Sequence, residues 1–226
     1  MERRKRWKSL WEVNEMKNLY IVGAGGCGRE VLQWVLDINK ITVQWSVKGF
    51  LDENLNALNG KVCEYTILDK PSTYKIQADD VFVCAIGDGA TRKKVVENLE
   101  ARGAHFISVV HPTAVVADTA VLGKGTILYP FSLVSDNTRT GNGCIINMFS
   151  SVAHDVVMGD YCTVSAHCDI TGQCILGNNV FLGSGAGMIP GVTVGNNVFI
   201  CAGSTVMSRV KDGIKVIGTP AKKAGF

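Results

Sequence analysis

The dominant hydrophobic pattern along this chain has a period of six and extends from Val116 to Lys211. The first position of each hexad is aliphatic or Met in fifteen of sixteen repeats, Thr140 being the exception, and the fifth position is always small. No helix has a period of six, and a simple alternating strand would not keep a large and a small position in fixed phase. The pattern therefore predicts a hexapeptide β-solenoid, in which each hexad forms one flat face and its turn.

A histidine at the third position of its hexad, His154, falls at a corner of this predicted solenoid. If three hexads form one coil, residues eighteen apart lie in neighbouring coils about 4.8 Å apart, which places Gly172 next to His154. Such a pair would put a general base beside a backbone N–H that can stabilise an oxyanion. Asp155 follows directly and would fix the tautomer of the imidazole. A purely structural role for His154 is the alternative interpretation.

The segment before the repeats combines a buried strand (18–24), the turn GAGGCG (23–28) and a helical stretch (29–37). In this context the glycines let a phosphate approach the backbone at a helix N-terminus. The segment has room for only one mononucleotide-binding half, so we expect it to bind a single nucleotide, such as the UDP part of a sugar nucleotide, rather than NAD. The alternative is a tight strand–helix turn that binds no ligand.

Further elements complete this predicted domain. One strand ends in the motif GFLDE, which would place Asp52 and Glu53 beside a ribose or base. The elements that follow are a strand over 81–86, a helix over 91–102 and a last strand over 105–110 that leads into the repeats. The domain is therefore predicted to be Rossmann-like, with alternating strands and helices.

The chain divides into four predicted segments: a disordered extension (1–15), the Rossmann-like domain (16–110), the β-helix domain (111–213) and a C-terminal tail (214–226). The net charge is only +3 over 226 residues, and five basic residues lie in the first eight positions, so nucleic acid is not an expected partner. No run approaches eighteen apolar residues, so no membrane span is expected. A weak basic amphipathic helix in the extension is the alternative to disorder.

The eight cysteines include no CxxC pair, and four of them occupy the small fifth position of a hexad. They are interpreted as small, inward-facing hydrophobes of a protein in the reducing cytosol, which predicts a cytoplasmic location. A zinc site would need three convergent imidazoles, and the histidine spacing does not offer them, so no metal is expected. His167 has no predicted role. The four cysteines in the fifth position are Cys144, Cys162, Cys168 and Cys174.

The motifs GAGGCGRE, GFLDE, AIGD, TRKKV, HPTA, SSVAHD and IGTPAKK, in this order over about residues 17–223, resemble the sialic-acid O-acetyltransferase and bacillosamine N-acetyltransferase family. This resemblance implies a left-handed parallel β-helix behind a nucleotide-sugar-binding domain. It also implies acetyl-CoA as the co-substrate, and a homotrimer whose active sites lie between neighbouring prisms.

The resemblance assigns roles by position. It implies that His154 is the general base, that Asp155 supports it, that the Gly172 N–H faces the thioester oxygen, and that Asn147 lines the substrate site. Cys27 stands where many relatives have a histidine that contacts the sugar nucleotide. The other implied nucleotide-sugar residues are Gly25, Gly26, Asp52, Glu53, Ile86, Gly87 and Arg92. The implied CoA-binding residues, besides Gly172, are Ala202, Gly218, Pro220 and Lys222.

The predicted function is acetyl-CoA-dependent N-acetylation of a UDP-linked 4-amino-deoxysugar by direct attack of the amine on the thioester. O-acetylation of sialic acid or another glycan sugar is an alternative within the same chemistry, because an amine and a hydroxyl need the same base. Two alternatives belong to other classes of function. One is a nucleotide-binding oxidoreductase or sensor, and the other is a scaffold trimer in which His154 is incidental.

Overall fold

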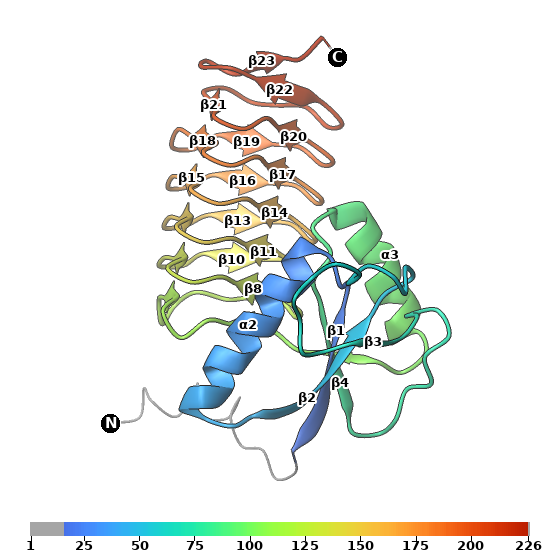
Figure 1. The fold of residues 1–226 in the computed structure, drawn as a ribbon. Helices are drawn as coiled ribbons and strands as arrows, with labels where there is room; N and C mark the ends of the chain where they lie inside the picture. Colours follow the sequence, from blue (N-terminus) through green and yellow to red (C-terminus); the bar gives the residue numbers. More distant parts are fainter. Residues whose placement is uncertain (1–15, 226) are drawn as a thin grey trace.

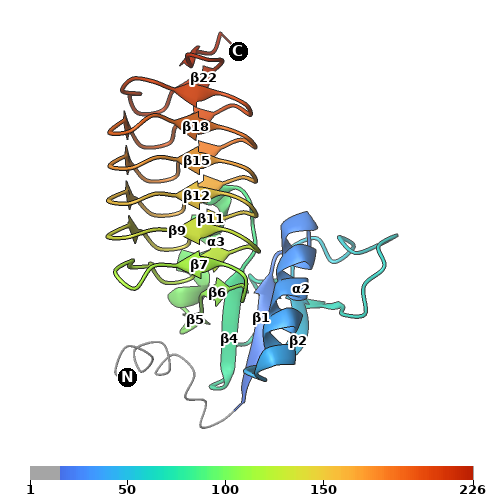
Figure 2. The same cartoon turned by 90° about the vertical axis from the view of Figure 1, so that its left-hand side faces the viewer.

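The computed structural model describes residues 16–225 as a three-sided parallel β-helix with an α/β domain against its lower coils (Figure 1). The predicted extension 1–15 lies outside the described residues. The α/β domain packs against one side of the prism and its adjoining corners, and no other element of residues 16–225 covers the remaining two sides (Figure 2). This one-sided arrangement decides where the parts of the candidate site lie.

The N-terminal domain is a five-stranded parallel sheet in the order β3-β2-β1-β4-β5. Both helices begin earlier than predicted, because a glycine of the preceding turn already has helical geometry in each case: α2 starts at Gly26 and α3 at Gly89. The elements are β1 Lys17–Val22, α2 Gly26–Ile41, β2 Trp45–Leu51, β3 Ile67–Asp69, β4 Asp80–Cys84, α3 Gly89–Glu100 and β5 His105–Phe106.

The strand predicted for 105–110 is two strands that belong to different domains. β5 pairs with β4 and completes the N-terminal sheet, whereas β6, Val109–Val110, pairs with β8 of the β-helix. The chain therefore passes from one domain to the other between residues 106 and 109, slightly before the predicted boundary at 110. The reason is that one short, mostly apolar segment serves two cores, which a hydrophobic pattern alone does not separate.

The β-helix has the predicted coil of eighteen residues, because the partner of each strand residue lies eighteen positions away, as in the series Ile127, Ile145, Thr163 and Phe181. Its strands form three parallel faces. The domain face contains β6, β8, β11, β14, β17, β20 and β22, with β23 added antiparallel at the end; the second face contains β7, β9, β12, β15, β18 and β21; the third face contains β10, β13, β16 and β19.

These strands are short, two residues each except β22, because a turn follows every hexad face. Their bounds are β7 Val115–Val116, β8 Ile127–Leu128, β9 Leu133–Val134, β10 Arg139–Thr140, β11 Ile145–Ile146, β12 Ser151–Val152, β13 Val157–Met158, β14 Thr163–Val164, β15 Asp169–Ile170, β16 Ile175–Leu176, β17 Phe181–Leu182, β18 Gly187–Met188, β19 Thr193–Val194, β20 Phe199–Ile200, β21 Thr205–Val206, β22 Lys215–Ile217 and β23 Lys222–Lys223.

The corners of the prism repeat with the hexads. From Gly125 to Gly203, every sixth residue has a positive φ, and Asp155 is one of these residues, with φ +60°. Glycine and asparagine tolerate this left-handed conformation best. The corner between the second and third faces, here called the far corner, contains the turns 135–138, 153–156, 171–174 and 189–192. It points away from the domain face.

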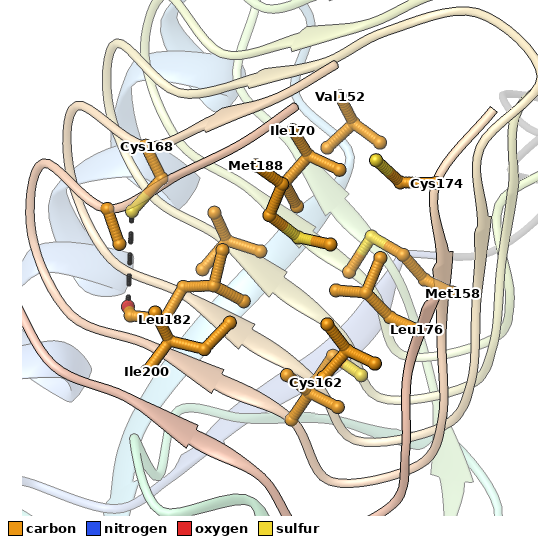
Figure 3. Packing of buried hydrophobic residues seen from close by; sticks show 14 of the residues in the cluster. Val152, Met158, Cys162, Cys168, Ile170, Cys174, Leu176, Leu182, Met188 and Ile200 are labelled. Atoms are coloured by element: carbon orange, nitrogen blue, oxygen red, sulfur yellow. Dashed lines mark hydrogen bonds between the residues drawn. The ribbon is translucent and has the colours of Figure 1, made fainter. Parts of the chain in front are cut away.

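The core of the prism is formed by the first and fifth hexad positions, as predicted (Figure 3). Met158, Leu176 and Leu182 fill it from the first position, and Cys162 and Cys168 from the fifth. All eight cysteines are free, and the four at hexad positions are buried inside the prism. Each fully buried aliphatic side chain contributes about 1.5–3 kcal/mol to the free energy of folding. The prism therefore has a hydrophobic core of its own and needs no packed helix to supply one.

The N-terminal domain covers the lower part of the domain face. Ile127, Tyr129 and Ile145 point outward from the prism and join the same apolar cluster as residues of β1 and α2. His111, predicted to be a turn residue, lies in this junction with its ring edge against Trp34, at 5.4 Å between ring centroids. No described residue of the N-terminal domain covers the far corner, which lies on the opposite side of the prism.

Candidate active site

The far corner carries the predicted catalytic pair. The Nδ1 atom of His154 lies 2.8 Å from Oδ2 of Asp155, and the two side chains are 60% and 47% exposed. The left-handed turn at Asp155 folds its carboxylate back toward the ring of the preceding residue. With Nδ1 bound to the carboxylate as an N–H donor, Nε2 remains free to accept a proton from a substrate.

Gly172 lies against the imidazole of His154, as the eighteen-residue coil predicts. A Cβ at position 172 would be 2.5 Å from Cε1 and 2.6 Å from Nε2 of that ring, closer than real side-chain contacts. The glycine is therefore required for the ring to lie flat against the next coil. The histidine covers Gly172, whose carbonyl accepts a hydrogen bond from Gly191. The predicted neighbourhood of base and glycine is thus present in the structure.

The backbone N–H groups at the far corner differ from those at the corner beside α3. There, an Asn or Asp side chain one coil further on accepts a hydrogen bond from the third N–H of each hexad, for example Asn178 Oδ1 from Asp160 at 2.8 Å. At the far corner the residue one coil further on is Gly172 for His154 and Pro190 for Gly172, and neither has a side chain that accepts a hydrogen bond. Within residues 16–225, no group accepts a hydrogen bond from the N–H of His154 or Gly172. These donors are available to a developing oxyanion.

The glycine turn of the N-terminal domain, residues 23–28, exposes two of its glycines and is fixed in place by a hydrogen bond to Asp52. Gly25 and Gly26 are exposed, and neither would meet any atom within 4 Å if it carried a Cβ. Gly28, in contrast, lies against the carbonyl of Gly23. Asp52 Oδ2 accepts a hydrogen bond from Ala24 at 2.7 Å, which ties the end of β2 to the turn.

The second predicted acidic residue beside this turn is engaged locally. Glu53 accepts hydrogen bonds from the N–H and the hydroxyl of Ser72, both at 3.1 Å, and it remains exposed. Ile86 and Gly87 follow β4, the neighbour of β1, and the Ile86 side chain lies beside Gly23. These residues therefore share the carboxyl edge of one parallel sheet, where such folds bind nucleotides.

Cys27 connects the glycine turn to the β-helix. Its Sγ lies 3.1 Å from the Oη atom of Tyr129, a residue that is fully buried under α2. Burial raises the pKa of the Cys27 thiol, so it is a neutral hydrogen-bonding group at neutral pH. Asn147 lies one coil above Tyr129, at the corner between the domain face and the second face. Cys27, Tyr129 and Asn147 thus gather at one corner, and His154 lies at another.

Arg92 differs from its predicted role. The resemblance assigns it to the nucleotide-sugar site, but its side chain is fully buried between the two domains. All three nitrogens of its guanidinium donate to backbone carbonyls or to a threonine hydroxyl. None of its donors is left for a ligand, so the structure does not support the expected direct contact of Arg92 with a nucleotide sugar; its bonds end instead on the turn at Ile86 and Gly87 and on the β-helix.

The implied CoA-binding residues lie at the C-terminal end of the prism. Ala202 lies in an exposed turn, and Gly218, Pro220 and Lys222 are exposed in and around the hairpin of β22 and β23. They are distant from the N-terminal domain (Figure 1). His167, without a predicted role, stacks on Phe149 at 5.1 Å between ring centroids.

Sequence reasoning missed Tyr129 and Thr163, which connect the two domains. Both occupy hexad positions that point outward, where the repeat allows any residue, so periodicity carries no signal for them. Within residues 16–225, no group of three or more metal-ligating side chains converges. None of the helices in that same range combines the length and the apolar character needed to cross a membrane.

Comparison with known proteins identifies both domains. Residues 18–99 match the PglD N-terminal domain, and residues 137–172 and 173–207 match the bacterial transferase hexapeptide (six repeats). The chain is 32% identical over 115 residues to the UDP-N-acetylbacillosamine N-acetyltransferase of Bacillus subtilis (strain 168). That alignment spans about half of this chain and half the length of the curated relative (50% and 51%).

Solved structures resemble the chain over nearly its whole length. PerB from Caulobacter crescentus, in complex with CoA and GDP-perosamine, has a TM-score of 0.84 at 26% identity, over 93% of this chain and 99% of that one. The acetyltransferase domain of PglB from Neisseria gonorrhoeae FA1090, in complex with acetyl coenzyme A, has a TM-score of 0.85 at 24% identity, over 93% and 100%, and shows the same fold.

These matches confirm the predicted fold class, a Rossmann-like half domain followed by a left-handed parallel β-helix. They also confirm the resemblance on which the site assignments depend. The chain therefore combines a PglD N-terminal domain with bacterial transferase hexapeptide repeats, and over nearly its whole length it is similar to PerB.

Proposed function

We propose that this chain transfers the acetyl group of acetyl-CoA to the amino group of a nucleotide-linked sugar, a UDP-linked 4-amino-deoxysugar in the first instance. The observation that supports this most is the arrangement at the far corner, where the His154 imidazole is held by Asp155 and lies flat against Gly172. One similar structure that covers 94% of this chain is a histidine-to-asparagine mutant of perosamine N-acetyltransferase from Caulobacter crescentus with CoA and GDP-perosamine bound.

The reaction proceeds by direct attack, without an acyl-enzyme. The neutral amine of the sugar attacks the thioester carbon, so that a C–N bond forms and the carbonyl oxygen becomes an oxyanion beside the Gly172 N–H. Nε2 of His154 takes the proton that the nitrogen loses. The C–S bond then breaks, the thiolate of CoA leaves, and the proton held on His154 neutralises it. Asp155 stabilises the imidazolium between these steps.

The two halves of the proposed site do not meet within one chain. The glycine turn, Cys27 and Asn147 lie beside the domain face, whereas His154 projects from the opposite corner. We therefore propose a homotrimer in which the far corner of one prism faces the nucleotide-binding turn of its neighbour, so that each active site lies between subunits. Closed cyclic symmetry lets three equal contacts form three equal sites.

CoA is expected to extend from the far corner toward the C-terminal hairpin. Ala202, Gly218, Pro220 and Lys222 lie at that end. The protein would act in the cytoplasm, where acetyl-CoA and nucleotide sugars are available and where its thiols stay reduced.

The test is an assay of thiol release from acetyl-CoA with a panel of acceptors: UDP-linked amino sugars, GDP-perosamine and free sialic acid. Release with an amino sugar that forms an acid-stable amide supports the proposal. Release only with sialic acid replaces N-acetylation by O-acetylation. No release with any acceptor, combined with no thermal protection by acetyl-CoA, contradicts an acetyltransferase, since a ligand that binds the folded state must raise its stability.

A further inference from the structure

Arg92 is the largest fully buried side chain of the described residues, and it joins the two domains. It lies near the start of α3, and its Nε donates to Gly143 O at 2.7 Å, in a turn of the β-helix. Its Nη2 donates to Tyr161 O and to the hydroxyl of Thr163, both at 2.9 Å. One guanidinium thus binds two consecutive coils of the prism.

The same guanidinium also holds a loop of the N-terminal domain. Nη1 donates to the carbonyls of Ile86 and Gly87, and the Thr163 hydroxyl donates to Gly87 O at 2.8 Å. Among the residues of the structure, no carboxylate bonds with Arg92, and burial lowers its pKa. A buried cation paired only with dipoles is costly to keep. Lysine could not replace it, because only a planar fork reaches carbonyls on several sides at once.

The geometry of the peptide units shows what this contact does on the other side of the loop. The peptide bonds at Ile86–Gly87 and Gly87–Asp88 are trans, so each N–H points opposite to the carbonyl of its own unit. Because both carbonyls face Arg92, the N–H groups of Gly87 and Asp88 point away from it, and no described group accepts from either. Gly87 and Asp88 are exposed. Hydrogen bonding at the carbonyl also polarises the N–H into a stronger donor.

We propose that Arg92 and Thr163 are positioning residues for the acceptor: they hold loop 86–88 so that its two N–H groups meet hydrogen-bond acceptors of the nucleotide sugar. The loop borders the glycine turn, since Ile86 contacts Gly23. This inference rests on the proposed function, because it concerns the substrate of the same site.

The anchoring of the loop has a consequence for the reaction. The loop belongs to the N-terminal domain by sequence, but it is anchored to the β-helix. Arg92 makes four hydrogen bonds to coils of the β-helix, and the Thr163 hydroxyl bonds directly to the loop. The position of its N–H groups is therefore fixed by the prism as well as by the N-terminal sheet. The sugar nucleotide is thus held at a fixed position along the prism axis, where it faces the far corner of the neighbouring subunit.

The test compares Thr163→Val with Thr126→Val. Each substitution removes one buried hydroxyl of the β-helix that donates to a carbonyl, but the partner of Thr126 is Gly123 O, a carbonyl of the β-helix itself and not of the loop. Binding of UDP, with GDP in parallel, is measured by calorimetry on the assembled protein. KM for the sugar nucleotide and for acetyl-CoA is measured on the acceptor that the wild type uses.

We expect Thr163→Val to weaken nucleotide binding and raise KM for the sugar nucleotide about threefold to tenfold, the effect of one hydrogen bond, with KM for acetyl-CoA unchanged. Arg92→Lys should weaken nucleotide binding more than Thr163→Val does. Thr126→Val should lower the unfolding temperature similarly and leave nucleotide binding intact. Wild-type binding of the nucleotide by Thr163→Val, or an equal loss in both threonine variants, overturns the inference alone. A wild type that binds no nucleotide sugar contradicts the proposed function instead.

Discussion

Replacement of Gly172 by alanine tests the geometry of the far corner. The new Cβ would lie 2.5 Å from Cε1 and 2.6 Å from Nε2 of His154. Carbon atoms in contact are separated by about 3.5–4.0 Å, so the ring must retreat by about 1 Å. Since His154 is exposed, it can move outward, which weakens its 2.8 Å bond to Asp155 and turns Nε2 away from the reacting amine.

The expected loss in kcat is about 10²–10³, because a displacement of about 1 Å costs on the order of 10² and the N–H donor is partly screened by the methyl group. This corresponds to about 3–4 kcal/mol of transition-state stabilisation. The fold should be intact, since the φ of Gly172 lies outside the left-handed region. The assay is steady-state acetyl transfer, with the unfolding temperature measured in parallel.

Gly187→Ala provides the matched control. Its Cβ would meet only the carbonyl of Asp169, at 3.6 Å, an ordinary contact. This variant should keep wild-type kcat, which shows that a methyl group on a coil does not by itself impair the prism. Wild-type kcat in Gly172→Ala would refute the argument that His154 needs to lie flat against this glycine.

Further predictions concern the base, the domain junction and the prism core. Asp155→Asn should lower kcat about 10²-fold, less than the roughly 10⁴ for a buried triad aspartate, because Asp155 is half exposed; unchanged kcat would remove Asp155 from the mechanism. Burial lowers the pKa of His111, so the unfolded state takes up its proton at higher pH, and the free energy of unfolding should fall as pH drops below about 6.5. Denaturant titrations at pH 7 and pH 5 should show this fall, and His111→Gln should reduce it. Leu176→Ala should cost about 2–5 kcal/mol, measured by the same titration, and a cost near zero would show that the prism core is not packed as described.

The features that sequence reasoning predicted are those that depend on the repeat. Once the period is six and the coil eighteen, the neighbour of His154 follows by counting, and the structure places Gly172 there. The inward direction of Cys162 and Cys168 follows in the same way. A repeat converts distance along the chain into distance in space, which an ordinary globular sequence does not do.

The features that could not be predicted depend on contacts between the two domains. Arg92 is in an unremarkable helical segment, and nothing local shows that its guanidinium enters the β-helix at Tyr161 and Thr163. The mostly apolar segment 105–110 gave no sign that it is shared by two sheets. The stack of His167 on Phe149 depends on corner geometry that the periodic pattern leaves free.

The central claim is that His154 of one copy acts on an acceptor held by another copy. Two inactive variants test it by mixing. His154→Ala removes the base, and Gly26→Glu places a carboxylate in the open glycine turn, where it repels a phosphate without a steric clash. The assay is acetyl transfer after the two proteins are unfolded and refolded together, compared with each one treated alone.

If each site lies between two subunits, it is active when its histidine comes from a Gly26→Glu subunit and its glycine turn from a His154→Ala subunit. In a random mixture of equal amounts this holds for about a quarter of the sites, so about a quarter of wild-type activity should return. Activity that stays at the level of the separate variants, in mixed trimers verified by mass, would contradict the shared site.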